Sequence, residues 1–296
     1  GLGLPIVMTV ANRAIGAPIN IWNDHSDSIS QRDSGWIQLF AETNQEALDL
    51  HIQAFKLAEE LSLPVMVCMD GFILTHAYER VDIPTQEQVD AFLPKYEPRQ
   101  VLDPNDPVSI GAMVGPEAFT EVRYLEHEKQ MQALELIPQI AEEFKAGFDR
   151  DSGGLVRGYR LEDAETVIVA MGSVLGTIKD TIDEMRANGA KVGALGVISF
   201  RPFPLQAVRA ALKNAKRVVV LEKTFAVGIG GILATDVRTA MGDIALHHYT
   251  VVAGLGGRPI TRKSLHEVFE KATRDDLPAL TFLDLDWAIV NKQLER

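Results

Sequence analysis

The residues best suited to chemistry in this sequence follow an apolar run near its start. Residues 4–11 (LPIVMTVA) are almost all apolar or β-branched, a pattern typical of a strand buried on both faces of a parallel sheet. Arg13 follows that run, and its guanidinium can hold a carboxylate or phosphate through two parallel hydrogen bonds. Because ligands bind at the carboxyl edge of such sheets, Arg13 is a candidate anion-binding residue. An alternative stays open, in which Arg13 pairs with Asp24 or Asp33 and only holds the loop.

The loop after this strand is rich in polar side chains, as sites on loops often are. Besides Arg13, its candidate site residues are Asn12, Asn23, Asp24, His25, Asp27 and Arg32. His25 lies between two aspartates, which would suit acid–base catalysis. A metal site is a weaker interpretation, since no second histidine lies nearby, and we predict none in this chain. On the residues alone, a hydrogen-bonded loop that uses Asp and Asn as turn residues is favoured.

The composition is that of a globular protein with a substantial core. The 296 residues, of which 46% are hydrophobic and 24% charged, predict two α/β domains. A net charge of −12 argues against nucleic acid and anionic membranes as partners. No apolar stretch approaches the roughly 20 residues that cross a bilayer. The sequence starts without Met and enters a strand almost at once, so we expect it to begin inside a domain.

The one cysteine, Cys68, lies in the apolar run PVMVCMD. A single cysteine cannot form an internal disulfide or hold an iron–sulfur cluster. We therefore expect a buried structural thiol in a protein of the reducing cytoplasm.

The first domain is predicted to span residues 1–155. A capping box at Thr43 and Glu46 opens a helix, and the apolar run 65–69 after it predicts a second buried strand. The proline-rich stretch 71–122 predicts an irregular arm. The sequence then indicates a helix over 126–148 that is interrupted at Pro138, and a glycine-rich linker over 149–159.

The second domain is predicted to span residues 156–296 and to be a doubly wound sheet. Buried strands alternate there with helices, and Ser173 is the expected N-cap of the first helix. Glycine clusters at 228–231 and 254–257 lie between strands and helices. Such turns can bind anions, but tight turns or close packing against another chain are the favoured explanation.

Several segments resemble the alpha subunits of the pyruvate:ferredoxin oxidoreductase family, the thiamine-diphosphate-dependent 2-oxoacid:ferredoxin oxidoreductases. The segments that carry this resemblance are ANRA (11–14), APINIWNDHSDS (17–28), RDSGW (32–36), DGF (70–72), FTEVRY (119–124) and GLGGRPIT (254–261). Residues 166–204 are also similar to the C-terminal domain of transketolase-like enzymes. The resemblance implies a partial pyrimidine-binding domain, lacking its N-terminal part, followed by a transketolase C-terminal-like domain.

The resemblance also implies an activity. Members of the family decarboxylate a 2-oxoacid on thiamine diphosphate, pass electrons through iron–sulfur clusters to ferredoxin, and transfer the acyl group to coenzyme A. By the same resemblance, Arg13 binds the substrate carboxylate. The same resemblance places the D-H-x-D loop, residues 24–27, close to the active site, although Asn23 stands where the family has glycine.

Partners follow from the resemblance as well. Beta, gamma and delta type subunits would complete a cytoplasmic hetero-oligomer, a dimer of the assembly. The beta subunit would share the cofactor, and Mg²⁺ and [4Fe-4S] clusters would lie on partner subunits. Two alternatives remain: a branched-chain or other 2-oxoacid as substrate, and a non-catalytic assembly subunit.

Overall fold

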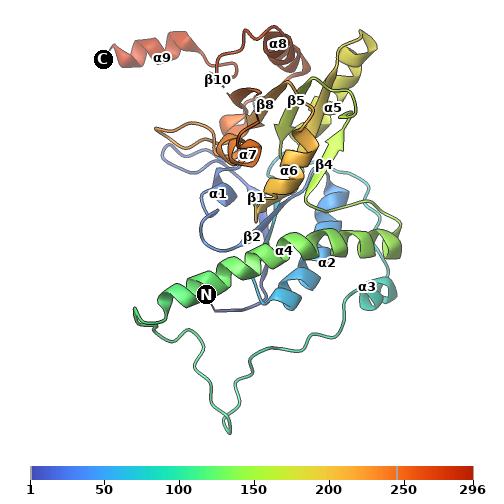
Figure 1. The fold of residues 1–296 in the computed structure, drawn as a ribbon, viewed down its shortest axis with the longest axis vertical. Helices are drawn as coiled ribbons and strands as arrows, with labels where there is room; N and C mark the ends of the chain where they lie inside the picture. The colour runs from blue at the N-terminus through green and yellow to red at the C-terminus, as the bar shows by residue number, and fades with distance from the viewer. Residues whose placement is uncertain (1, 245, 296) are drawn as a thin grey trace.

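The computed structural model describes residues 2–244 and 246–295, and it builds them around two β-sheets with helices packed on their faces (Figure 1). The first sheet has the order β1-β3-β2-β7, with β7 antiparallel to β2 and the other strands parallel. These strands are β1 (Val7–Asn12), β2 (Ile37–Phe40), β3 (Val65–Asp70) and β7 (Ser199–Arg201). The register places Asn12 opposite Asp70, so the ends of β1 and β3 lie side by side.

Helix α2 packs against one face of the first sheet, and α4 packs on α2. The helices of this half are α1 (Ser26–Ile29), α2 (Asn44–Leu61), α3 (Gln86–Phe92) and α4 (Phe119–Phe148). The Thr43 side chain accepts a hydrogen bond from the Glu46 N–H at 3.1 Å, as the sequence predicts. The Glu46 carboxylate, however, accepts from the N–H of Glu42 at 2.7 Å rather than from that of the cap residue.

The prediction that Pro138 interrupts the long helix was wrong. Helix α4 runs through Pro138 and begins at Phe119, seven residues earlier than expected. Proline removes one backbone donor, but the buried residues on both sides of it, such as Ala133 and Ile140, keep the helix packed against α2. Residues 119–122, at the end of the arm predicted over 71–122, already belong to α4, and the rest of the arm contains α3 and no other helix or strand within the described part of the chain. It forms the long loop at the bottom of Figure 1.

The second sheet has the order β10-β9-β8-β5-β6-β4 and is parallel except for the edge strand β4. Its strands are β4 (Val156–Tyr159), β5 (Thr166–Ala170), β6 (Val192–Val197), β8 (Arg217–Glu222), β9 (His247–Val252) and β10 (Leu280–Phe282). The linker predicted over 149–159 was wrong in its last part, because residues 156–159 pair with β6 and extend the sheet.

Helices cover both faces of the second sheet, which confirms the doubly wound arrangement. Helices α5 and α8 pack on one face, and α6 and α7 pack on the other. These helices are α5 (Val174–Ala187), α6 (Leu205–Leu212), α7 (Leu233–Met241) and α8 (Arg262–Thr273); a last helix, α9 (Trp287–Leu294), follows β10.

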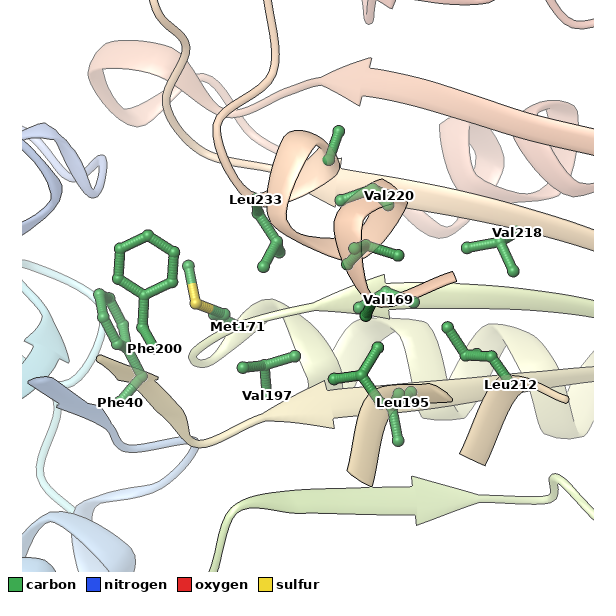
Figure 2. Packing of buried hydrophobic residues seen from close by; sticks show 14 of the residues in the cluster. Phe40, Val169, Met171, Leu195, Val197, Phe200, Leu212, Val218, Val220 and Leu233 are labelled. Atoms are coloured by element: carbon green, nitrogen blue, oxygen red, sulfur yellow. The ribbon is translucent and has the colours of Figure 1, made fainter. Parts of the chain in front are cut away.

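One hydrophobic cluster joins the two sheets. Figure 2 shows Phe40 beside Phe200, with ring centroids 6.0 Å apart, and the cluster continues through Met171 and Val197 into the second sheet. Cys68 belongs to this cluster and is buried, as predicted. The division into domains at residue 155 stays a prediction, since β7 from the second half completes the first sheet. Among the described residues, no helix is long and apolar enough to cross a membrane.

Candidate active site

The carboxylate of Asp70, at the end of β3, is the centre of a buried polar cluster. Its Oδ1 lies 2.6 Å from Nε2 of His25 and accepts a hydrogen bond from Nδ2 of Asn23 at 3.2 Å. Its Oδ2 accepts from the backbone N–H of Ser173 at 2.8 Å and from the Ser173 hydroxyl, and lies 3.3 Å from Nζ of Lys223. We call these five residues the Asp70 cluster.

The topology of the two sheets brings these residues together. Ser173 follows β5 and Lys223 follows β8, and these two strands are neighbours in the second sheet. From β5 the chain continues to β6 on one side, whereas from β8 it continues to β9 on the other, so the cluster lies at the topological switch point. Ser173 occupies the N-cap position of α5, as predicted, but its side chain forms no capping hydrogen bond because its hydroxyl donates to Asp70.

The electrostatics of the cluster favour an ionised Asp70. Burial by itself would raise the pKa of the carboxyl. Electrostatic interactions with His25 and Lys223, with hydrogen bonds from His25 and Ser173, outweigh burial and lower the Asp70 pKa well below its ordinary value. Because a carboxylate can only accept hydrogen bonds, Nε2 of His25 carries the proton between them.

Arg13 follows the last residue of β1, and its side chain is exposed. Its backbone N–H donates to Oδ2 of Asp27 at 3.1 Å. Within the described residues its guanidinium forms no hydrogen bond or ion pair. Instead, Asp24 accepts from Ser26, and Asp33 pairs with Arg32 at 3.6 Å. Arg13 therefore does not hold the loop by pairing with Asp24 or Asp33, and its guanidinium is available to an anion.

Asn12 lies under the loop and is fully buried. Its Oδ1 accepts hydrogen bonds from the hydroxyl and N–H of Ser28, at 2.7 and 3.2 Å. Its carbonyl accepts from Nδ2 of Asn23 at 3.3 Å and from the N–H of Gly71 at 3.1 Å. A Cβ at residue 71 would lie 2.4 Å from that carbonyl oxygen, so only glycine allows this close approach of β1 and β3.

The glycine turn after β9 packs on the same loop. The N–H of Gly256 donates to Oδ2 of Asp24 at 3.2 Å, and the Gly256 carbonyl accepts from Nδ2 of Asn20 at 3.2 Å. A Cβ at Gly257 would lie 2.5 Å from Cβ of Trp22. These glycines therefore pack closely against a loop of the same chain.

A cavity of about 360 Å³ opens beside the Asp70 cluster. Asn23, Ser173 and Lys223 contribute polar groups to its wall, and Trp22 and Phe72 contribute aromatic ones. Hydrogen bonds through Asp70 and the Asn12 carbonyl bring three of the candidate residues, Asn12, Asn23 and His25, together at the carboxyl ends of β1 and β3.

Arg32, by contrast, lines a different cavity of about 420 Å³ together with Arg123 and Arg201. The structure therefore does not unite this candidate with the others.

Polar atoms without partners remain in this region. Within the described residues, Nδ2 of Asn12, Oδ1 of Asn23 and Nδ1 of His25 are buried and form no hydrogen bond. Such atoms are costly unless a bound group or water satisfies them. The described residues contain no group of three His, Cys, Asp or Glu side chains that could hold a metal ion.

Sequence reasoning did not identify Asp70, Ser173 and Lys223 as members of one site. Each of them follows a buried strand closely or ends it. The carboxyl ends of parallel strands lie on one edge of their sheet, so polar residues at those positions were the signal that could have found them.

Two comparisons with family models agree with these two α/β halves. Residues 1–142 match "Pyruvate flavodoxin/ferredoxin oxidoreductase, thiamine diP-bdg", and residues 164–265 match "Pyruvate:ferredoxin oxidoreductase core domain II". Together these models cover most of the chain.

Curated relatives agree with the family models. The chain is 47% identical over 296 residues to the pyruvate synthase subunit PorA of Methanosarcina barkeri, covering 96% of this chain and 73% of that protein. It is 38% identical over 273 residues to the ketoisovalerate oxidoreductase subunit VorA of Pyrococcus horikoshii, covering 91% of this chain and 69% of that protein. The chain belongs to the pyruvate:ferredoxin oxidoreductase family and corresponds to its alpha-type subunit.

A solved structure supports the fold. The 2-oxoglutarate:ferredoxin oxidoreductase of Magnetococcus marinus superposes with a TM-score of 0.63 at 18% identity, over 92% of this chain and 49% of that one. At this identity the likeness concerns the fold alone.

Proposed function

We propose that this chain is the substrate-side subunit of a pyruvate:ferredoxin oxidoreductase. The complex would convert pyruvate to acetyl-CoA and CO₂ and pass the electrons to ferredoxin. The observation that carries the proposal is Arg13: its backbone is held in a hydrogen-bonded loop at a sheet edge, while its guanidinium has no partner among the described residues.

Arg13 would bind the carboxylate of the 2-oxoacid. Two parallel hydrogen bonds from the guanidinium would fix the plane of the carboxylate and so orient the bond that breaks when CO₂ leaves. Thiamine diphosphate, when bound, supplies the electron sink for that step. Asn23 lines the cavity beside the Asp70 cluster and its Oδ1 has no hydrogen-bond partner among the described residues, so it is suited to bind a polar group there.

The remaining chemistry would come from partner subunits. The single cysteine of this chain cannot hold a [4Fe-4S] cluster, so we assign clusters and the Mg²⁺ of the cofactor to beta, gamma or delta type subunits. Coenzyme A would be the co-substrate and ferredoxin the electron acceptor. The resemblance implies a dimer of this assembly, and a place in the reducing cytoplasm fits a chain whose one thiol is buried.

Pyruvate is favoured over a branched-chain substrate by similarity. The PorA subunits of Methanosarcina barkeri and Thermotoga maritima are 47% and 43% identical to this chain, whereas the VorA subunit of Pyrococcus horikoshii is 38% identical. Arg13 would contact only the carboxylate that all 2-oxoacids share, so it does not discriminate between these substrates.

Replacement of Arg13 tests the proposal. In a complex assembled with the full-length subunit, Arg13→Ala should lose about 2–5 kcal/mol of substrate binding, since the change removes one partner of a charge pair. We expect the KM for pyruvate to rise accordingly, and Arg13→Lys to recover only part of the loss.

Arg274→Ala is the matched control, because Arg274 is also exposed and forms no side-chain ion pair among the described residues. Its KM should stay at the unmodified value. An unchanged KM and kcat in Arg13→Ala would contradict the assignment.

A further inference from the structure

Asp70 occupies the place where an open α/β sheet usually binds a ligand. At the switch point of the second sheet, the N–H of Ser173 before α5 and the ammonium of Lys223 after β8 form the kind of anion site found at such crevices. The carboxylate of Asp70, from the first sheet, occupies this site: it accepts a hydrogen bond from the Ser173 N–H at 2.8 Å and pairs with the Lys223 ammonium at 3.3 Å. The second half of the chain thus binds a side chain of the first half.

We propose that Lys223 is a positioning residue which, through Asp70 and His25, fixes the loop that carries Arg13. The inference rests on the proposed function, because it takes Arg13 as the group that binds the substrate carboxylate. It gives a role to the Asp70 cluster that the family assignment does not.

The first part of the path runs from Lys223 to the strand end before Arg13. The Lys223 carbonyl accepts a hydrogen bond from the N–H of His25 at 2.9 Å, and its ammonium pairs with Asp70. Asn23 donates from one amide nitrogen both to Asp70, at 3.2 Å, and to the carbonyl of Asn12, at 3.3 Å. The residue before Arg13 is therefore held by the Asp70 cluster.

The second part of the path fixes the backbone on either side of the guanidinium. The N–H of Arg13 donates to Asp27 at 3.1 Å, and the N–H of Ile15 donates to the hydroxyl of Ser26 at 2.9 Å. Both acceptors lie within two residues of His25. A shift of His25 would consequently move both anchors of the Arg13 backbone.

Because Lys223 is buried, removal of its charge should disturb the position of the Arg13 loop. Lys223 is only 3% exposed and Asp70 only 1%, so each charge depends on the other. Loss of Lys223 leaves the buried Asp70 carboxylate with only its hydrogen bonds to His25, Asn23 and Ser173, and this loss of charge compensation favours a local rearrangement. Since a displacement of about 1 Å can cost 100-fold in rate, a rearrangement here should be visible in substrate binding.

The test compares two lysine variants in the assembled complex. Lys223→Met removes the charge from the cluster. Lys179→Met is the matched control, because Lys179 pairs with Glu42 at 2.5 Å and also joins the two halves, but it lines a separate cavity. We expect the KM for pyruvate to rise about tenfold in Lys223→Met and to stay unchanged in Lys179→Met.

A double variant separates action through Arg13 from a general effect. If Lys223 acts through Arg13, Lys223→Met should raise KM no further in an Arg13→Ala background. An additional rise there, or a KM in Lys223→Met equal to that of Lys179→Met, would overturn the inference. If Arg13→Ala alone left KM unchanged, the proposed function would fail as well.

A milder variant keeps the test open if Lys223→Met does not assemble. Ser173→Ala removes one hydrogen bond to Asp70 and keeps the ion pair. We expect a KM for pyruvate raised about threefold, as the loss of one hydrogen bond implies. A KM equal to that of the unmodified complex would contradict the inference.

Discussion

Glu222, the last residue of β8, should make the stability of this chain depend on pH. Its carboxylate is buried and accepts hydrogen bonds from the first N–H groups of α7, at 2.8 Å from Ile232 and 2.9 Å from Leu233. Burial raises the pKa of Glu222 to about 7, although these hydrogen bonds act in the opposite direction. The change we propose is Glu222→Gln, which keeps the shape and removes the titration.

The size of the effect follows from linkage. Between its ordinary pKa of 4.5 and about 7, Glu222 holds a proton in the folded chain that the unfolded chain has lost. The stability from this group is complete below pH 4.5 and falls as the pH rises towards 7. The whole window corresponds to about 3 kcal/mol of unfolding free energy.

Urea unfolding of the full-length subunit at several pH values measures this contribution. The free energy of unfolding of the unmodified subunit, minus that of Glu222→Gln, should fall by about 3 kcal/mol between pH 4.5 and 7.5. A difference that stays constant, or that grows with pH, would show that the helix N–H groups stabilise the charged form and would refute the reasoning.

Further predictions concern the strand edge and the core. Gly172 has φ +75° and a Cβ there would lie 3.0 Å from Oδ2 of Asp70, so Gly172→Ala should lower the unfolding free energy by about 1–3 kcal/mol; an unchanged urea midpoint would contradict this. Burial raises the pKa of Cys68 to about 12, so a thiol reagent should modify it only as fast as the chain unfolds, and rapid modification of the native chain would disprove the packing.

The regular elements could be predicted from sequence because their signals are local. Apolar runs predicted strands at residues 4–11 and 65–69, and the structure has β1 and β3 at these places. The run 65–69 is buried as predicted, but the prediction that residues 4–11 are buried on both faces was wrong, because β1 is an edge strand and Met8 is 41% exposed. Edge strand β4 was missed because it is short and glycine-containing, and β7 was missed because its partner is a strand far away along the chain. Pairing of that kind leaves no local pattern.

The site was predicted in part for the same reason. Arg13 and the D-H-x-D loop could be recognised within one segment of sequence. The contacts of His25 with Asp70 and Lys223 depend on how two sheets face each other, which no spacing in the sequence encodes. The polar residues at the strand ends could be read from the sequence, but which of them contact one another is determined by the fold.

The most direct test of the account measures CO₂ release from pyruvate labelled at its carboxyl carbon. Purified partner subunits would be assayed without this chain, with the full-length subunit, and with its Arg13→Ala variant. We predict release only when the subunit is present, and a decrease of about 30-fold or more in Arg13→Ala at low pyruvate. Release by the partner subunits alone, or equal release with Arg13→Ala, would contradict the claim that this chain binds the substrate.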